Sequence, residues 1–203
     1  GYKFLAISIL ATFIVLFFSK FVGSLFILIT VWVYYFFRDP ERYSINDDSY
    51  LVSPADGLIT DISEKSGPEE LRLENTSFTK ISIFMNVFNC HVNRIPSSGK
   101  VEEIYYKPGK FLNASLDKAS EENERNYFKI KLSNGEDIII VQIAGLIARR
   151  IVCEVEQGQE LKQGERIGMI RFGSRVDIYF KNKKVLAKLG QNVVAGESIL
   201  ASE

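Results

Sequence analysis

The sequence predicts a mostly β fold, a barrel or a sandwich, that follows a hydrophobic helical segment at the N-terminus. Three observations lead to this fold class. The first 37 residues are almost wholly apolar, the residues after position 50 fall into short β-branched and aromatic runs, and a ten-residue pattern occurs twice near the C-terminus. Such runs, bounded by turn residues, are typical of strands, and many short strands favour a closed or layered β architecture.

The N-terminal region consists of two apolar segments, residues 4–18 and 21–37, which Ser19 and Lys20 separate. Each segment is somewhat shorter than the about 20 residues that a transmembrane helix needs. Two tilted helices in a hairpin, or one span followed by an interfacial segment, both fit this pattern. A secretory signal peptide is disfavoured, because no small-residue cleavage site follows the apolar run. We therefore expect residues 1–37 to be a membrane anchor of one or two helices.

Positive charges after the anchor favour a cytoplasmic body. Arg38 and Arg42 follow the second apolar segment, and cationic residues beside a span tend to remain on the cytoplasmic side. Trp32 and Tyr34 lie near the end of the same segment, where aromatic residues commonly meet the membrane surface. The expected location is therefore the cell membrane, with the rest of the protein on its cytoplasmic side.

A polar linker at residues 38–50 leads to a body at residues 51–203 that is expected to form one mostly β domain. Nine runs in this body are typical of strands; they are 57–63, 80–88, 100–106, 127–133, 137–145, 150–155, 166–172, 175–180 and 198–203. Residues 112–125 differ, since they are polar and charged on most faces, and we expect a helix or a mobile loop there.

The repeated pattern relates residues 158–167, GQELKQGERI, to residues 190–199, GQNVVAGESI. Its glycines suit turns, and its alternation of residue types suits strands. The spacing resembles the hairpins of biotinyl- and lipoyl-carrier domains, which carry a modified lysine at a hairpin tip. Neither copy contains a Met-Lys-Met or Asp-Lys-Ala sequence. The pattern therefore predicts biotinyl/lipoyl-like hairpins rather than a carrier function.

Composition and charge narrow the function classes. Twenty-five Lys and Arg residues balance 25 Asp and Glu residues, and no long basic run occurs, so we expect no nucleic-acid partner. Cys90 and Cys153 are too few for a disulfide framework and are expected to be reduced thiols. The chain also has too few His and Cys residues for a common structural zinc site, and we expect no metal.

Four stretches differ from ordinary strand sequence, and they are FFRDPER, VSPADGLI, FMNVFNCHVNRIP and RFGSRVDIYF. They supply a carboxylate (Asp56), the one histidine of the chain (His91) and a hydroxyl (Ser174). These are the groups that an activated serine needs, although only geometry defines a triad. Simpler interpretations remain open, because Asp56 and its neighbours also suit a turn, a lone histidine is often structural, and a Gly-Ser pair is common.

Together these stretches resemble the short class of the phosphatidylserine decarboxylase family. The similarity extends from about residue 36 to the C-terminus, and its five ordered blocks are FFRDPER, SPADG, HVNRIPSSGKVEEIYYKPGKFLNA, QIAGLIARRIVC and GMIRFGSRVDIYF. The resemblance implies a carboxy-lyase of phospholipid biosynthesis, a membrane-bound zymogen that converts phosphatidylserine to phosphatidylethanolamine and CO2.

In this family a Gly-Ser bond breaks itself, which here implies autocatalytic cleavage between Gly173 and Ser174. The resulting fragments, 1–173 and 174–203, would stay associated. The resemblance implies that Ser174 becomes a covalent pyruvoyl group. Loss of CO2 leaves a carbanion that requires an electron sink, and the pyruvoyl carbonyl can accept those electrons without an external cofactor.

The resemblance also implies roles for other side chains. His91 is the leading candidate to return a proton to the substrate α-carbon. Asp56 is expected to orient or polarise a partner during self-cleavage. Arg94 is a candidate to bind phosphate or carboxylate through its guanidinium group, with a solvent-facing position or a structural ion pair as the alternative.

The sequence departs from longer family members at two places. Their Leu-Gly-Ser-Thr cleavage site is Phe-Gly-Ser-Arg here, and their second histidine, three residues after the first, is replaced by Arg94. The family's cleavage triad uses that second histidine. Either His91 serves both steps, or another group supports cleavage.

Two alternatives to this function remain at the level of the sequence. The enzyme could act on a serine headgroup attached to another lipid backbone, because the headgroup chemistry would be identical. The chain could instead be a non-enzymatic, membrane-anchored module of the biotinyl/lipoyl type, which would leave SPADG, HVNRIP and FGSR unexplained. The expected partners are a phospholipid substrate and the membrane, and assembly into a homo-oligomer is left open.

Overall fold

The computed structural model describes residues 1–109, 122–145, 150–171 and 174–203. These residues form two compact units, Gly1–Pro40 and Glu41–Glu203. Most of the predicted helix or loop at 112–125 lies outside the described residues, and so does Gly173.

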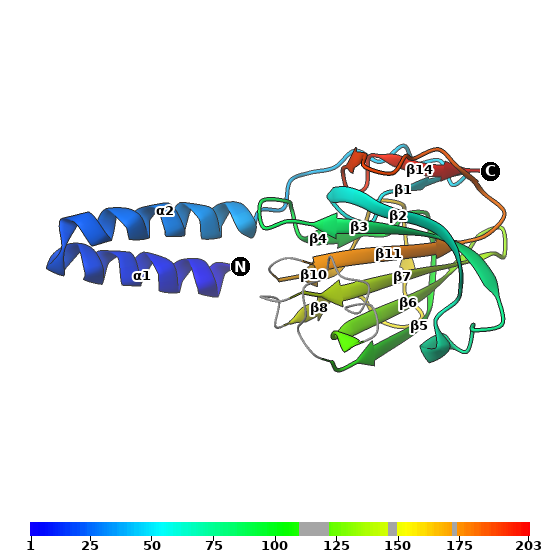
Figure 1. Ribbon diagram of the computed structural model, residues 1–203, viewed down its shortest axis with the longest axis horizontal. Coiled ribbons are helices and arrows are strands. Elements are labelled where there is room, and N and C mark those ends of the chain that lie inside the picture. The colour runs from blue at the N-terminus through cyan, green and yellow to red at the C-terminus, as the bar shows by residue number, and fades with distance from the viewer. Residues whose placement is uncertain (110–121, 146–149, 172–173) are drawn as a thin grey trace. The chain divides into compact units, whose positions relative to one another are not determined.

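The N-terminal unit is a hairpin of two antiparallel helices, α1 (Tyr2–Phe18) and α2 (Lys20–Phe36) (Figure 1). Ser19 ends the first helix with an extended backbone, and its hydroxyl accepts a backbone N–H from the first turn of the second. The hydroxyl groups of Thr12 and Thr30 lie 2.9 Å apart across the hairpin. In the part of the chain that the structure describes, neither helix combines the length and the apolar character of a membrane-crossing helix. The membrane anchor stays a prediction.

The C-terminal unit is mostly β, which confirms the predicted class. Its main sheet curls into half a barrel and has eight antiparallel strands in the order β13-β2-β3-β11-β7-β6-β5-β9 (Figure 1). These strands are β2 (Gly57–Ser66), β3 (Ser77–Met85), β5 (Gly99–Lys107), β6 (Arg125–Leu132), β7 (Asp137–Ala144), β9 (Glu160–Leu161), β11 (Ser174–Phe180) and β13 (Asn192–Val193).

Two three-stranded sheets and one short 3-10 helix complete the described part of this unit. One sheet has the order β1 (Tyr50–Val52), β14 (Ile199–Ser202) and β12 (Lys184–Val185). The other has the order β4 (Val92–Arg94), β10 (Arg166–Ile170) and β8 (Ile151–Cys153). The 3-10 helix η1 (Glu69–Leu71) lies between β2 and β3. Each of the nine expected strands has a counterpart, whereas the short strands β1, β4, β9, β12 and β13 were not separately predicted, because two or three residues show no period.

The strand order of the main sheet is symmetric about the β11–β7 pair. The two copies of the ten-residue repeat supply its opposite edges, since β9 pairs with β5 and β13 pairs with β2. The N–H of Gly158 donates to the carbonyl of Val101, and the N–H of Gly190 donates to the carbonyl of Ile59. Each copy therefore adds one edge strand through equivalent backbone hydrogen bonds.

A second repeat, which is shorter, supports the same symmetry. Pro-x-x-Gly occurs at residues 54–57 and at residues 96–99, and its glycines begin β2 and β5. A Cβ at Gly57 would collide with the carbonyl oxygen of Phe84, so only glycine lets β2 start this close to β3. The SPADG block thus has a structural reason for its glycine.

The main hydrophobic core lies between one face of the eight-stranded sheet and the two small sheets. It contains Ile83, Ile140 and Val176 from the large sheet and Leu51 and Ile170 from the small ones, all buried. A smaller cluster on the opposite face contains Phe78, Tyr127, Ile139 and Val141. Because successive side chains of a strand point to opposite faces, β7 is apolar on both and lies at the centre of the fold.

Candidate functional site

Ser174 is the first residue of β11, and its side chain is fully buried. Its neighbours across the sheet are Met85, the last residue of β3, and Ala144, the last residue of β7. The Ser174 hydroxyl donates to the thioether sulfur of Met85, with Oγ and Sδ 3.4 Å apart. Strand pairing on both sides therefore fixes the backbone at the predicted nucleophile.

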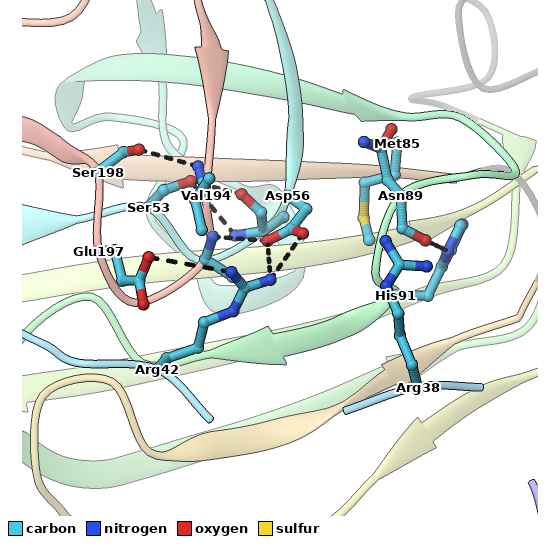
Figure 2. Close-up of polar contacts among 12 residues, drawn as sticks. Arg38, Arg42, Ser53, Asp56, Met85, Asn89, His91, Val194, Glu197 and Ser198 are labelled. Carbon is cyan, nitrogen blue, oxygen red and sulfur yellow. Dashed lines mark hydrogen bonds and ion pairs between the residues drawn. The ribbon is translucent and has the colours of Figure 1, made fainter. Parts of the chain in front are cut away.

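His91 is fully buried immediately before β4, and an asparagine-rich turn positions it. The side chains of Asn86 and Asn89 accept backbone N–H groups within this turn at 2.8 and 2.9 Å, which is how asparagine commonly holds a turn. The carbonyl oxygen of Asn89 lies 3.0 Å from Nδ1 of His91 (Figure 2). A carbonyl only accepts, so Nδ1 carries the hydrogen, and the neutral ring has its lone pair at Nε2.

Asp56 is buried and paired with Arg42. Nη2 of Arg42 donates to both carboxylate oxygens, at 3.1 and 2.8 Å, and the N–H of Ala195 donates to Oδ1 at 2.8 Å (Figure 2). Glu197 adds a longer contact to Arg42 at 3.9 Å. The FFRDPER and SPADG blocks are thus joined by an ion pair, a charge-assisted contact that is stronger than a neutral hydrogen bond.

The two copies of the internal repeat separate the role of Asp56 as a hydrogen-bond acceptor from the role of its negative charge. Asp56 and Ser98 hold the third position of their Pro-x-x-Gly turns, and Ala195 and Gln163 hold equal positions in the ten-residue repeat. The N–H of Ala195 donates to Asp56, just as the N–H of Gln163 donates to the hydroxyl of Ser98 at 3.2 Å. The backbone bond therefore needs only an oxygen acceptor, and the negative charge is what distinguishes Asp56.

Among the described residues, no hydrogen bond joins the side chains of Asp56, His91 and Ser174. Asp56 belongs to the group around Arg42. The strand that follows His91, β4, pairs with β10, and the carbonyl of His91 accepts the N–H of Ile170, four residues before Ser174. The described contacts therefore do not join the three predicted groups into one hydrogen-bonded set.

Arg94 is also largely buried, and its Nη1 donates to the carbonyl of Gly164 at 2.9 Å. This bond agrees with the structural alternative for Arg94. Together with Arg42 and Arg166, however, Arg94 lines a cavity of about 660 Å³. Pairing of β4 with β10 sets Arg94 opposite Arg166. Three guanidinium groups and one carboxylate, that of Glu165, thus line the cavity, and this excess of guanidinium groups is suited to an anion.

Sequence reasoning missed the contacts that hold the predicted residues. The charge of Arg42 indicates a topology in the sequence and says nothing of its pairing with Asp56. Nothing in the sequence indicates that Met85 contacts Ser174. The sequence did contain one further signal, because Gln142 interrupts the apolar run of β7 on the face of the main core. Strand periodicity alone does not say what such a residue contacts.

Comparison with known proteins identifies relatives along the whole chain. The model of the phosphatidylserine decarboxylase family matches residues 29–201. The chain is 64% identical over 203 residues to a phosphatidylserine decarboxylase proenzyme of Pelagibacter ubique (strain HTCC1062), covering 100% of this chain and 94% of the relative. It is 49% identical over 202 residues to proenzymes of the same name from Rickettsia akari (strain Hartford) and Ruegeria pomeroyi (strain ATCC 700808 / DSM 15171 / DSS-3), covering 99% of this chain and 87% and 92% of those relatives.

Replacement of Asp56 tests how much its negative charge contributes to stability. Asp56→Ser keeps an acceptor where Ser98 makes the equivalent bond, but it leaves Arg42 without its close carboxylate. We expect the free energy of unfolding to fall by about 1–3 kcal/mol, because a largely buried charged donor loses its partner. Urea unfolding would be measured in a Ser174→Ala chain, which is expected to stay intact.

Ser98→Ala is the matched control, since it removes only the neutral bond to Gln163. It is expected to cost about 1 kcal/mol. An unchanged free energy of unfolding in Asp56→Ser would show that the Arg42 ion pair adds nothing to stability.

Proposed function

Because this chain belongs to the phosphatidylserine decarboxylase family, we propose that it is a proenzyme that converts phosphatidylserine to phosphatidylethanolamine and CO2 with a pyruvoyl group made from Ser174. The position of Ser174 carries this assignment. Its hydroxyl is buried at the start of a strand, and two neighbouring strands pair with its backbone. A new chain end at this point stays in place because both ladders persist after the bond before it is cut.

The surroundings of Ser174 fit a small carbonyl group. The neighbouring Met85 and Ala144 add no charge, and the site is shielded from bulk water. A pyruvoyl carbonyl supplies the electron sink that decarboxylation of an amino acid requires. The strand ladder would hold that carbonyl in one orientation, and burial would protect it from side reactions.

Self-cleavage consumes only water. Oγ of Ser174 attacks the carbonyl carbon of Gly173, the bond from that carbon to the Ser174 nitrogen breaks, and the hydroxyl proton moves to the nitrogen, which gives an ester. Loss of the Ser174 α-proton expels the Gly173 carboxylate and leaves dehydroalanine. Hydrolysis of its imine tautomer releases ammonia and leaves the ketone. The products are the fragments 1–173 and 174–203.

His91 is the proposed proton donor to the substrate α-carbon. The bond from Nδ1 to the Asn89 carbonyl supports this role, because it fixes the ring and assigns exchange of the working proton to Nε2. As the one imidazole of the chain, His91 is also the candidate base for self-cleavage. Asp56 is proposed to act electrostatically in cleavage, with Arg42 as its orienting partner.

The cavity beside Arg94 is the proposed place for the anionic part of the headgroup. Arg42, Arg94 and Arg166 line it, and guanidinium groups bind phosphate and carboxylate through paired N–H donors. The Gly164 carbonyl holds one nitrogen of Arg94 and limits its rotation. Arg94 would thereby contribute to substrate binding without taking part in the chemistry.

The helical hairpin is proposed to hold the enzyme at the cell membrane, with the β unit on the cytoplasmic side. Large apolar side chains that are exposed on the helices support this location, among them Phe13, Phe17, Phe18, Phe21 and Leu28. Burial of such side chains in lipid is favourable by about 1.5–3 kcal/mol each. A lipid substrate also favours a tethered enzyme, because its headgroup is reached only at the membrane surface.

Intact mass under denaturing conditions tests the proposed cleavage. We expect two chains that divide before Ser174, with a pyruvoyl-blocked smaller chain that resists Edman degradation. Ser174→Ala should give one intact chain and no decarboxylation of phosphatidylserine, because it lacks the nucleophile. A wild-type chain of unmodified full-length mass, in a preparation that decarboxylates phosphatidylserine, would contradict the proposed cofactor.

Replacement of His91 tests its proposed role. In the cleaved fraction of His91→Gln, kcat should fall by about 10²–10⁴-fold with little change in KM, which is the usual contribution of a general acid. The measurement is CO2 release from phosphatidylserine in mixed micelles, normalised to the amount of smaller fragment. Wild-type kcat in cleaved His91→Gln would exclude His91 as the proton donor, and a chain that stays uncleaved would assign His91 to the first reaction.

Sedimentation with lipid vesicles tests the location. Phe13→Asp and Phe17→Asp should each lower partitioning onto phosphatidylserine-containing vesicles by about tenfold or more, because a buried phenylalanine contributes at least about 1.5 kcal/mol. Leu189→Asp, an apolar position on the β unit that is about as exposed as Phe13, is the control and should bind as wild type. Unchanged binding of both helix variants would show that the hairpin does not contact lipid.

A further inference from the structure

Three buried carboxamides form a hydrogen-bonded chain that ends beside Ser174. Nδ2 of Asn126 donates to Oε1 of Gln142 at 3.4 Å, and Nε2 of Gln142 donates to Oδ1 of Asn93 at 2.8 Å. Nδ2 of Asn93 then donates to the sulfur of Met85 at 3.7 Å, and the same sulfur accepts the hydroxyl of Ser174. The sulfur is thus held between the carboxamide of Asn93 and the predicted nucleophile.

The strand register explains how this chain reaches the nucleophile. Gln142 of β7 pairs with Val176 of β11 and with Asn126 of β6. Since Ser174 and Val176 are two residues apart, Ser174 and Gln142 point to the same face of the sheet, which is the face of the main core. Asn93 comes from β4, in the small sheet that packs on the same core. The polar chain therefore crosses the core from one sheet to the other.

Stability alone is a weak reason for three amides in an apolar core. A buried amide costs free energy unless it is hydrogen-bonded, and apolar side chains of the same shape are often equally stable. The final acceptor is a thioether, which accepts hydrogen bonds only weakly. What the arrangement does provide is order, because methionine has three rotatable bonds and adapts freely when nothing holds it.

We propose that Asn93, oriented by Gln142 and Asn126, holds the sulfur of Met85 so that it positions the hydroxyl of Ser174 for self-cleavage. A thioether cannot remove the hydroxyl proton, so Met85 is a positioning residue and the base is a different group. Its weakness as an acceptor suits this task, since the hydroxyl must leave that contact when it attacks. The inference rests on the proposed function, because it concerns cleavage before Ser174.

The first test compares the two methionines of the chain. Met85→Leu keeps the volume but removes the acceptor, and Met169→Leu is the matched control on β10, outside the amide chain. The full chain would be synthesised in a cell-free system with phosphatidylglycerol vesicles, and the appearance of fragment 174–203 would be followed after a pulse of label. We expect cleavage to slow roughly tenfold in Met85→Leu, as for loss of one productive hydrogen bond, and to be unchanged in Met169→Leu.

A second variant separates positioning from folding. In Asn93→Leu/Gln142→Leu/Asn126→Leu, apolar side chains replace all three carboxamides, so no amide of the chain is left buried without its partner. Urea unfolding in a Ser174→Ala background should show stability equal to or above that of the parent, while cleavage of the otherwise wild-type chain is slowed as in Met85→Leu. Slow cleavage together with a loss of stability would indicate a purely structural role and would overturn the proposal.

Hydroxylamine shows which step of self-cleavage is slow in Met85→Leu, because it cuts the ester intermediate directly. If Met85 positions the hydroxyl for the first attack, little ester forms in Met85→Leu, and hydroxylamine will not restore the wild-type rate of fragment release. Restoration would place the defect after ester formation and overturn the proposal, as would cleavage of Met85→Leu at the wild-type rate. A wild-type chain that itself stays intact would instead overturn the proposed function, and this inference with it.

Discussion

The pairing of β11 between β3 and β7 is the interaction on which the rest of the structure depends. Seven residues of β11 pair with β3 and six of them also pair with β7. Val176, Ile178 and Phe180 add fully buried side chains to these two ladders. A strand held by backbone hydrogen bonds on both sides and by core packing needs no peptide bond at its start. The proposed chemistry can therefore break the chain before Ser174 without releasing the fragment that carries the reactive group.

The symmetric strand order of the main sheet shows that two copies of the same turn and repeat hold its opposite edges. One of these copies also carries a charged pair. Two Pro-x-x-Gly turns and two ten-residue repeats make equivalent backbone contacts at opposite edges of the sheet. In one copy the acceptor is the neutral hydroxyl of Ser98, and in the other it is the carboxylate of Asp56, which also pairs with Arg42. The framework tolerates either acceptor, so the charge is an addition to the fold and not a requirement of it.

Several buried polar groups occur where the core is otherwise apolar. His91, Asn93 and Gln142 are fully buried, the ring of His91 bonds to a turn carbonyl, and the amide of Gln142 donates to that of Asn93. In such surroundings hydrogen bonds are strong and an unpaired polar group costs free energy, so each side chain keeps one orientation. Burial thus serves two purposes, because it excludes water from the proposed reaction and it limits the motion of the side chains that surround the nucleophile.

The sequence by itself determined the mostly β class, nine of the strands, the two apolar N-terminal segments and the family, because runs of β-branched residues and short motifs are local properties. It also singled out Asp56, His91 and Ser174 by residue type. Only the tertiary structure decided that Asp56 pairs with Arg42 and that Ser174 contacts Met85, 89 residues away in the chain. It alone revealed β4, which is too short to show a period, and the amide chain that crosses the core. Such contacts depend on strand register and sheet packing, which bring together residues whose spacing in the sequence carries no signal.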